Sequence, residues 1–167
     1  MELHDVTPSS AGPRDRALRA GIHCLELVAE VQPGNWAAHW MRGKGHQALD
    51  DHRSAAAAFR EAYAREPGNP DVGRELVLSL LELGAAGEAV PIARAGVALS
   101  PGDAGLRANL ALVLLLDAQV GDASSEVDIA LSIAPADPIS QTVRTLITEV
   151  QAGSRAQPSS LRDLQGG

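Results

Sequence analysis

The side chains most suggestive of chemistry are three histidines, His39, His46 and His52. Neutral imidazole is a common ligand of zinc and other divalent metals, so three histidines close in space could hold a metal ion. His39 and His46 are seven residues apart, which puts them on one face of a helix, whereas His52 follows beyond a turn. The spacing alone leaves open both a metal site and a packing role.

The rest of the sequence carries no recognisable catalytic signature. It contains no CxxC, HExxH, phosphate-binding loop or glycine-rich nucleotide-binding motif, and no strand–turn–helix elbow that would present a nucleophilic serine. The single cysteine, Cys24, cannot form an intramolecular disulfide, and its helical context favours a small buried hydrophobe over a reactive thiol. We therefore expect a protein that is not an enzyme.

Length and charge narrow the class of partner. The 167 residues suit one domain or one short repeat array. A net charge of -7 would repel a phosphate backbone, so nucleic acid is not an expected partner. The longest apolar run, Leu110–Leu116, is far too short to span a membrane, and residues 1–13 lack the pattern of a secretory signal. With a single cysteine, these features predict a cytoplasmic protein that has no membrane partner.

Prolines recur at a constant interval along the chain. Pro33, Pro67, Pro101 and Pro135 are separated by 34 residues each, and each precedes a turn-forming or small segment. Because proline cannot continue a helix, each one marks the same helix end. A fixed interval of this length is typical of stacked copies of one supersecondary unit.

Small residues occupy equivalent positions between the prolines. Such side chains let two helix backbones approach closely. The equivalent sets are Ala55, Ala89 and Ala123, and seven residues later Ala62, Gly96 and Ala130. The pattern predicts two antiparallel helices in each unit, joined near Asp50–Asp51, Gly84–Gly87 and Gly121–Asp122.

At these residues the chain resembles the tetratricopeptide repeat family. The unit over residues 36–69 has the family's signature glycine, alanine, phenylalanine, alanine and proline at Gly43, Ala55, Phe59, Ala62 and Pro67. The next two units match at Leu76, Gly84, Ala89 and Pro101, and at Leu110, Ala123, Ala130 and Pro135. The resemblance implies an all-α fold, a right-handed solenoid of stacked antiparallel helix pairs.

The resemblance also bears on the histidines. His39 and His46 stand where the family prefers packed aromatic residues. It therefore implies packing roles for both, and we expect no metal ion and no other cofactor.

The interval divides the chain into successive segments. Three full repeats cover residues 36–69, 70–103 and 104–137, with a helix over 14–32 before them and a capping helix over 138–152 after them. The two ends are rich in Ser, Pro and Gly, so we expect a disordered tail over 1–13 and a flexible tail over 153–167.

In the family that the chain resembles, the first helix of each repeat lines a concave groove. An exposed apolar stripe in such a groove is typical of a protein-binding site. The resemblance assigns to this groove Trp40, Met41, Lys44, Arg74, Glu75, Leu78, Leu81, Asn109, Leu112, Leu115 and Leu116. Trp40 either anchors a partner or packs against the helix over 15–31. The leucines are either open or covered by the final helix or by the tail segment Leu161–Leu164.

Some members of the family hold the terminal carboxylate of a peptide with Lys, Arg and Asn. The corresponding positions here are Trp40, Lys44, Glu75, Gly105 and Asn109, and only Asn109 agrees in type. Tails of heat-shock chaperones are therefore not expected ligands. The Asn109 amide could still donate to and accept from the backbone of an extended peptide.

We expect a protein–protein interaction module, an adaptor or scaffold that holds an extended or helical segment of another protein in the groove. Two alternatives stay open. Short, acidic three-repeat proteins similar to this one act as secretion chaperones that keep hydrophobic export substrates soluble in bacteria. The apolar third repeat could instead pack against a second copy, which would give a homodimer.

Overall fold

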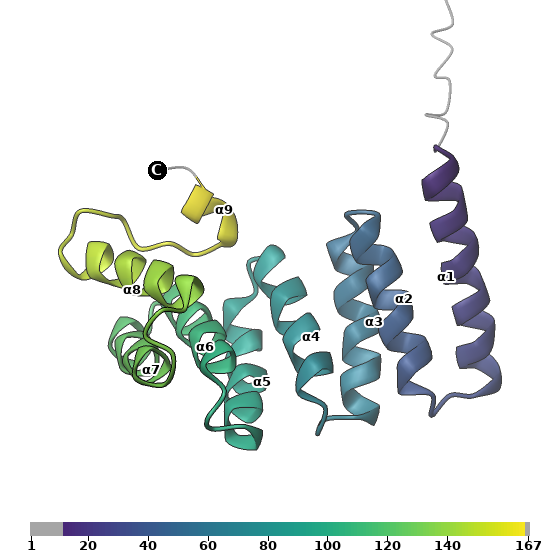
Figure 1. The fold of residues 1–167 in the computed structure, drawn as a ribbon. Coiled ribbons are helices and arrows are strands. Elements are labelled where there is room, and N and C mark those ends of the chain that lie inside the picture. The colour runs from purple at the N-terminus through teal and green to yellow at the C-terminus, as the bar shows by residue number, and fades with distance from the viewer. Residues whose placement is uncertain (1–11, 166–167) are drawn as a thin grey trace, which may run out of the picture.

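The computed structural model describes residues 12–165, and within this range the chain forms nine helices and no strand. The helices are α1 (Pro13–Val31), α2 (Trp36–Ala48), α3 (His52–Arg65), α4 (Pro70–Glu82), α5 (Ala86–Leu99), α6 (Ala104–Leu116), α7 (Val120–Ile133), α8 (Pro138–Gln151) and α9 (Leu161–Gln165). Figure 1 shows α1 to α8 stacked in chain order along one array, with α1 at one end. This arrangement confirms the predicted all-α solenoid of helix pairs.

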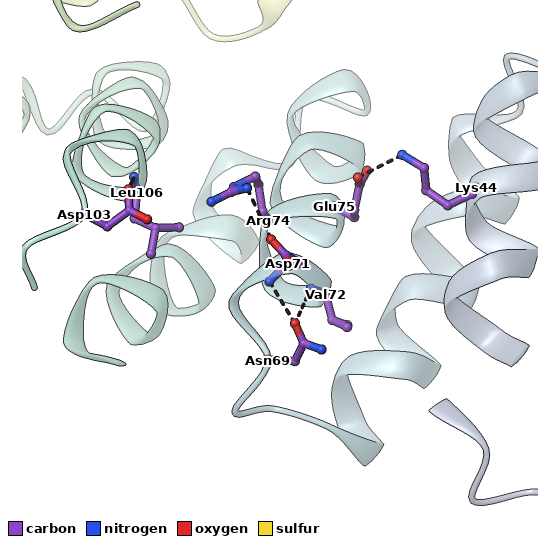
Figure 2. Close-up of polar contacts among 8 residues, drawn as sticks. All are labelled: Lys44, Asn69, Asp71, Val72, Arg74, Glu75, Asp103 and Leu106. Atoms are coloured by element: carbon purple, nitrogen blue, oxygen red, sulfur yellow. Dashed lines mark hydrogen bonds and ion pairs between the residues drawn. The ribbon is translucent and has the colours of Figure 1, made fainter. Parts of the chain in front are cut away.

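The first helix of every repeat begins at a capping side chain. Asn35, Asn69, Asp103 and Asp137 each accept a hydrogen bond from a backbone N–H in the first turn of the following helix. Figure 2 shows Asn69, whose Oδ1 accepts from the amides of Asp71 and Val72 at 3.0 and 3.4 Å. The four caps follow the four periodic prolines by two residues, so the interval in the sequence fixes where these helices start.

The turn inside each repeat contains one residue with a left-handed backbone. Asp50, Gly84 and Ala118 have φ angles of 62°, 70° and 59°. Glycine is the residue that adopts this conformation without steric cost. The third turn has Ala118 at this position, so no glycine marks the turn in the sequence. The joint predicted at Gly121–Asp122 is therefore wrong, because both residues belong to the first turn of α7.

The first and second helices of the repeats lie on opposite faces of the array. On one face, ion pairs join Arg60 of α3 to Glu88 of α5 at 2.7 Å, and Arg94 of α5 to Asp122 of α7 at 2.9 Å. On the other, Lys44 of α2 is bonded to Glu75 of α4. We call the surface formed by α2, α4, α6 and α8 the first-helix face; it corresponds to the groove predicted from the sequence.

The core between these two layers consists mainly of leucine, valine and alanine. Leu76, Leu80, Leu110 and Leu114 are almost fully buried, as are the alanines at the predicted close-contact positions. Apolar burial of this kind is the main term that stabilises such an array. All four aromatic residues belong to α2 and α3 of the first repeat; they are Trp36, Trp40, Phe59 and Tyr63.

Residues 153–165, which we call the C-terminal segment, differ from the flexible tail that the composition predicts. The chain turns after α8 and returns to place α9 beside α4 (Figure 1). Gln157 Nε2 donates to the carbonyl of Leu115 at 2.5 Å, and the side chains of Leu161 and Leu164 pack against the core. Apolar burial and this main-chain contact explain why a segment of polar composition is ordered.

The N-terminal end differs from the prediction at Cys24. Its thiol is exposed, because α1 packs on α2 with only one face, through the buried Ile22 and Ala29. The predicted small buried role for Cys24 is therefore wrong. The predicted disordered tail over 1–13 lies outside the described residues except for Gly12 and Pro13, and Pro13 is the first residue of α1.

Candidate protein-binding groove

A polar bridge joins the first two repeats on the first-helix face. Lys44 Nζ donates to Glu75 Oε1 at 2.8 Å, and Gln47 Nε2 donates to Glu75 Oε2 at 3.0 Å. Figure 2 shows Lys44 reaching from α2 toward Glu75 on α4. Both carboxylate oxygens are bonded and the lysine charge is balanced, so this part of the face has little net charge to offer an acidic peptide.

Trp40 lies next to this bridge. Its ring is half-buried and packs against the core, while the Lys44 ammonium sits 6.0 Å from the ring centroid. The buried indole Nε1 has no hydrogen-bond partner. Met41, one turn away from Lys44 on α2, is exposed. The indole ring of Trp40 is thus packed against the core, and its buried N–H lies out of reach of a ligand at the surface.

Arg74 and Asn109 lie at the rim of a small apolar cavity. The cavity has a volume of about 20 Å³ and lies between the ends of α3 to α6, with Tyr63, Val77, Ile92 and Leu106 among its lining residues. Arg74 also donates to Asp71 at 3.3 Å along its own helix (Figure 2). A cavity of this size and polarity fits a methyl group better than a water molecule, which needs polar partners.

The five leucines assigned to the groove divide into two sets. Leu78 is 37% exposed and Leu112 is half-buried, so both remain accessible on the first-helix face. Leu81, Leu115 and Leu116 are only 1%, 0% and 5% exposed. The assignment of these three leucines to an open groove is therefore wrong, because they are buried in the core. Leu115 lies under the C-terminal segment, whose Gln157 is bonded to its carbonyl group.

Of the three histidines, only His39 is buried, whereas His46 and His52 are partly buried. His39 is buried without a hydrogen-bond partner on either ring nitrogen, and burial lowers the pKa of its imidazole, with Arg65 and Arg42 adding to the effect. His46 lies 3.6 Å from Asp51, and His52 lies 3.5 Å from Asp50. Among residues 12–165 there is no group of three histidine, cysteine or acidic side chains that could hold a metal ion.

Two features of this surface were not expected from the sequence. The first is the Lys44–Glu75–Gln47 bridge, which needs the relative position of two helices that lie in different repeats. The second is Gln157, which no periodic pattern identifies. The sequence did name Leu161–Leu164 as one candidate cover, and the apolar spacing of that short segment was the available signal.

The described residues define a helix-pair solenoid whose first-helix face carries the accessible Leu78 and Leu112 beside the paired charges of Lys44 and Glu75. None of the helices within 12–165 has the length and apolar character needed to cross a membrane. A scan against protein-family models found no match to the sequence, and a search of curated proteins found none either.

Solved structures, in contrast, match over most of the chain. MamA from Desulfovibrio magneticus RS-1, residues 41 to its end, has a TM-score of 0.71 and 17% identity, over 85% of this chain and 87% of that one. YrrB, described as a TPR protein with an unusual peptide-binding site, has a TM-score of 0.72 and 17% identity, over 90% and 76%. The first TPR of Spaghetti (RPAP3), bound to the HSP90 peptide SRMEEVD, has a TM-score of 0.64 and 13% identity, over 70% and 93%.

These similarities define the fold. The chain has the tetratricopeptide repeat fold, as the 34-residue interval and its small residues predicted.

Proposed function

We propose that this chain is a non-enzymatic protein-interaction module whose first-helix face holds an extended or helical segment of another protein. The observation that carries the proposal is the C-terminal segment. It lies against α4 and α6 with two leucines packed on the core and a glutamine side chain bonded to the main chain of α6. A surface that takes a leucine-bearing segment of its own chain has the shape and polarity to take one from a partner.

The open part of the face supplies further contacts. Leu78 and Leu112 are accessible on α4 and α6, and the Asn109 amide offers a donor and an acceptor to a peptide backbone. Burying one leucine contributes roughly 1.5–3 kcal/mol. A few such contacts, after the cost of ordering the peptide, reach about -8 kcal/mol, which corresponds to micromolar affinity.

The charge balance favours a ligand with few charges. Lys44 is paired with Glu75, and Arg74 is paired with Asp71. The RPAP3 domain is described in complex with an acidic HSP90 peptide, and YrrB is described with a peptide-binding site. These neighbours support peptide binding as the kind of function. The local ion pairs here support an apolar segment in place of an acidic tail.

The burial of side chains in α6 bears differently on the two alternative functions, self-association and a secretion-type chaperone. Self-association through the third repeat loses its basis, since Leu114, Leu115 and Leu116 of α6 are buried. A secretion-type chaperone remains a prediction, because it would use the same face for a hydrophobic substrate. We place the adaptor role first because Leu78 and Leu112 form a small apolar site that suits one segment.

The test compares baits in a quantitative pull-down from source lysate. The full chain is used beside the Leu78→Asp/Leu112→Asp variant, with Ile129→Asp as a control because Ile129 is exposed on α7 of the opposite layer. We expect a protein that is retained by the wild type and the control and lost with the double variant. Equal retention by all three folded baits would overturn the groove as the binding site.

A second arm tests the receptivity of the face with a defined probe. The probe is a fluorescent peptide of residues 153–165, and the receptor is the chain truncated after Ala152. We expect micromolar binding to the truncated chain and at least tenfold weaker binding to the full chain, whose own segment occupies the site. No binding to a truncated chain that circular dichroism shows to be folded would contradict the proposal.

A further inference from the structure

The outward side of α1 is an exposed apolar surface at the end of the array. Figure 1 shows α1 as the terminal helix, with α2 on one side of it. Leu27 and Val28 are exposed, and Val31 is 80% exposed. Among residues 12–165, α2 is the one helix that makes an extensive contact with α1. A stripe of this kind on a terminal helix indicates an interaction site.

The repeat register explains why this side of α1 is apolar. Gly21, Cys24 and Val28 precede Ala55, Ala58 and Ala62 by 34 residues each, which makes α1 equivalent to the second helix of a repeat. The three alanines are buried in α3, whereas all three residues of α1 are exposed. In α3 the first helix of the same repeat contributes to that burial, and α1 has no such helix among the described residues. The surface is therefore of the type that a helix covers.

We propose that a second copy of this chain covers the surface, through antiparallel pairing of two α1 helices about a two-fold axis near Cys24. The exposed residues on this side are evenly spaced about that cysteine, with small residues before it and large residues after it. Such a pairing brings Ala17 near Val31, Ala20 near Val28, and Gly21 near Leu27 of the other copy. Each small residue then meets a large one, as close helix packing requires.

Charge selects the antiparallel direction. Arg16 and Glu30 lie two heptads apart on the same flank of the stripe, one near each end of α1. Antiparallel pairing brings Arg16 of each copy toward Glu30 of the other, which gives two attractive contacts. In parallel pairing, the flank that carries Arg16 and Glu30 would face the opposite flank of the other copy, so neither contact would form. One helix pair is a small interface, so we expect a dissociation constant in the micromolar range.

This association is independent of the first-helix face, so its failure would leave the proposed peptide binding untouched. Analytical ultracentrifugation of the full chain should show a concentration-dependent rise from 17.3 kDa toward twice that mass. A short bismaleimide should cross-link two chains through their Cys24 thiols, each of which adds across one maleimide double bond. Leu27→Asp should abolish both signals, while Ile129→Asp should leave both unchanged. A single-chain mass at all concentrations, or cross-linking that survives Leu27→Asp, overturns the proposal.

Charge reversal tests the direction of pairing. Arg16→Glu and Glu30→Arg should each weaken the dimer about tenfold, because each places like charges together. The double variant restores opposite charges at both contacts, so the dissociation constant should return to within about threefold of the wild type. Circular dichroism at matched concentration would show that all three variants are folded. A double variant that stays as weak as the singles would overturn the antiparallel arrangement.

Discussion

Lys44 Nζ lies 2.8 Å from Glu75 Oε1 and so joins the first repeat to the second across the first-helix face. The ion pairs on the other face follow the repeat: Arg60 and Arg94 are 34 residues apart, and so are their partners Glu88 and Asp122. The Lys44–Glu75 pair has no equivalent between later repeats within residues 12–165, since Leu78 and Asn109 stand at the corresponding positions. This one contact therefore sets the local charge of the candidate groove.

Removing the carboxylate of Glu75 should change ligand preference more than stability. Lys44→Met and Glu75→Gln should each lower the free energy of unfolding by about 1 kcal/mol or less, with a coupling of roughly 0.2–1 kcal/mol in the double variant, because both groups are partly exposed. Urea unfolding at low and high salt would measure this coupling. In Glu75→Gln the lysine charge is no longer balanced, so an acidic peptide should bind more tightly than it does to the wild type. Arg60→Gln, on the opposite face, is the matched control and should leave peptide binding unchanged.

The buried His39 should make stability depend on pH. Burial lowers the pKa of its imidazole below the ordinary 6.5, so between these two values the unfolded chain binds more protons than the folded chain. This contribution to stability is fully present above pH 6.5 and is lost as the pH falls through 6.5 toward the lowered pKa. Urea midpoints measured between pH 8 and pH 5 should fall less steeply for His39→Phe. Equal slopes for the two proteins would contradict a neutral buried role for His39.

Because α2 and α3 are in close contact at Gly43, replacing this glycine should lower the stability of the chain. A Cβ atom at Gly43 would lie 2.5 Å from Cε1 of the fully buried Phe59. We expect Gly43→Ala to lose roughly 1–3 kcal/mol of stability from overpacking, despite the higher helix propensity of alanine. Gly96→Ala is the matched control, because its nearest neighbour would be Leu106 Cδ2 at 3.8 Å. It should gain about 0.5–1 kcal/mol in denaturant unfolding.

The left-handed turn residues should respond to substitution in opposite directions. Ala118 has a φ of 59°, where an alanine is strained by roughly 1–2 kcal/mol, so Ala118→Gly should stabilise the chain by about 1 kcal/mol. Gly84→Ala should destabilise it by a similar amount, since Gly84 holds the equivalent turn. Thermal unfolding of the two variants provides the comparison. A loss of stability in Ala118→Gly would show that the turn is not strained.

The repeat interval made most of the fold predictable. Prolines and small residues at constant spacing gave the helix pairs, because one packing solution recurs in every unit. The third turn was misplaced because its left-handed residue is an alanine, which carries no turn signal. The exposure of Cys24 was missed for another reason. A helical pattern shows which side of α1 is apolar, but α1 has apolar residues on both sides and only one of them is covered by α2.

The candidate groove was predictable only in outline. The register of the resemblance identified the face, and Leu78 and Leu112 are accessible there. Burial of Leu81, Leu115 and Leu116 depends on tertiary packing and on the C-terminal segment, which lies outside the repeat interval. The balance of Lys44 by Glu75 depends on the angle between α2 and α4, and sequence spacing does not specify that angle.

The confinement of aromatic residues to α2 and α3 has a spectroscopic consequence. Both tryptophans, Trp36 and Trp40, report on the first repeat alone, while circular dichroism averages over every helix. Neighbour-to-neighbour packing in such arrays allows one end to open before the other. Fluorescence and ellipticity recorded in the same denaturant titration would therefore separate the melting of the N-terminal end from that of the remainder. The two native tryptophans thus act as fluorescent reporters of the first repeat, and no fluorophore needs to be introduced.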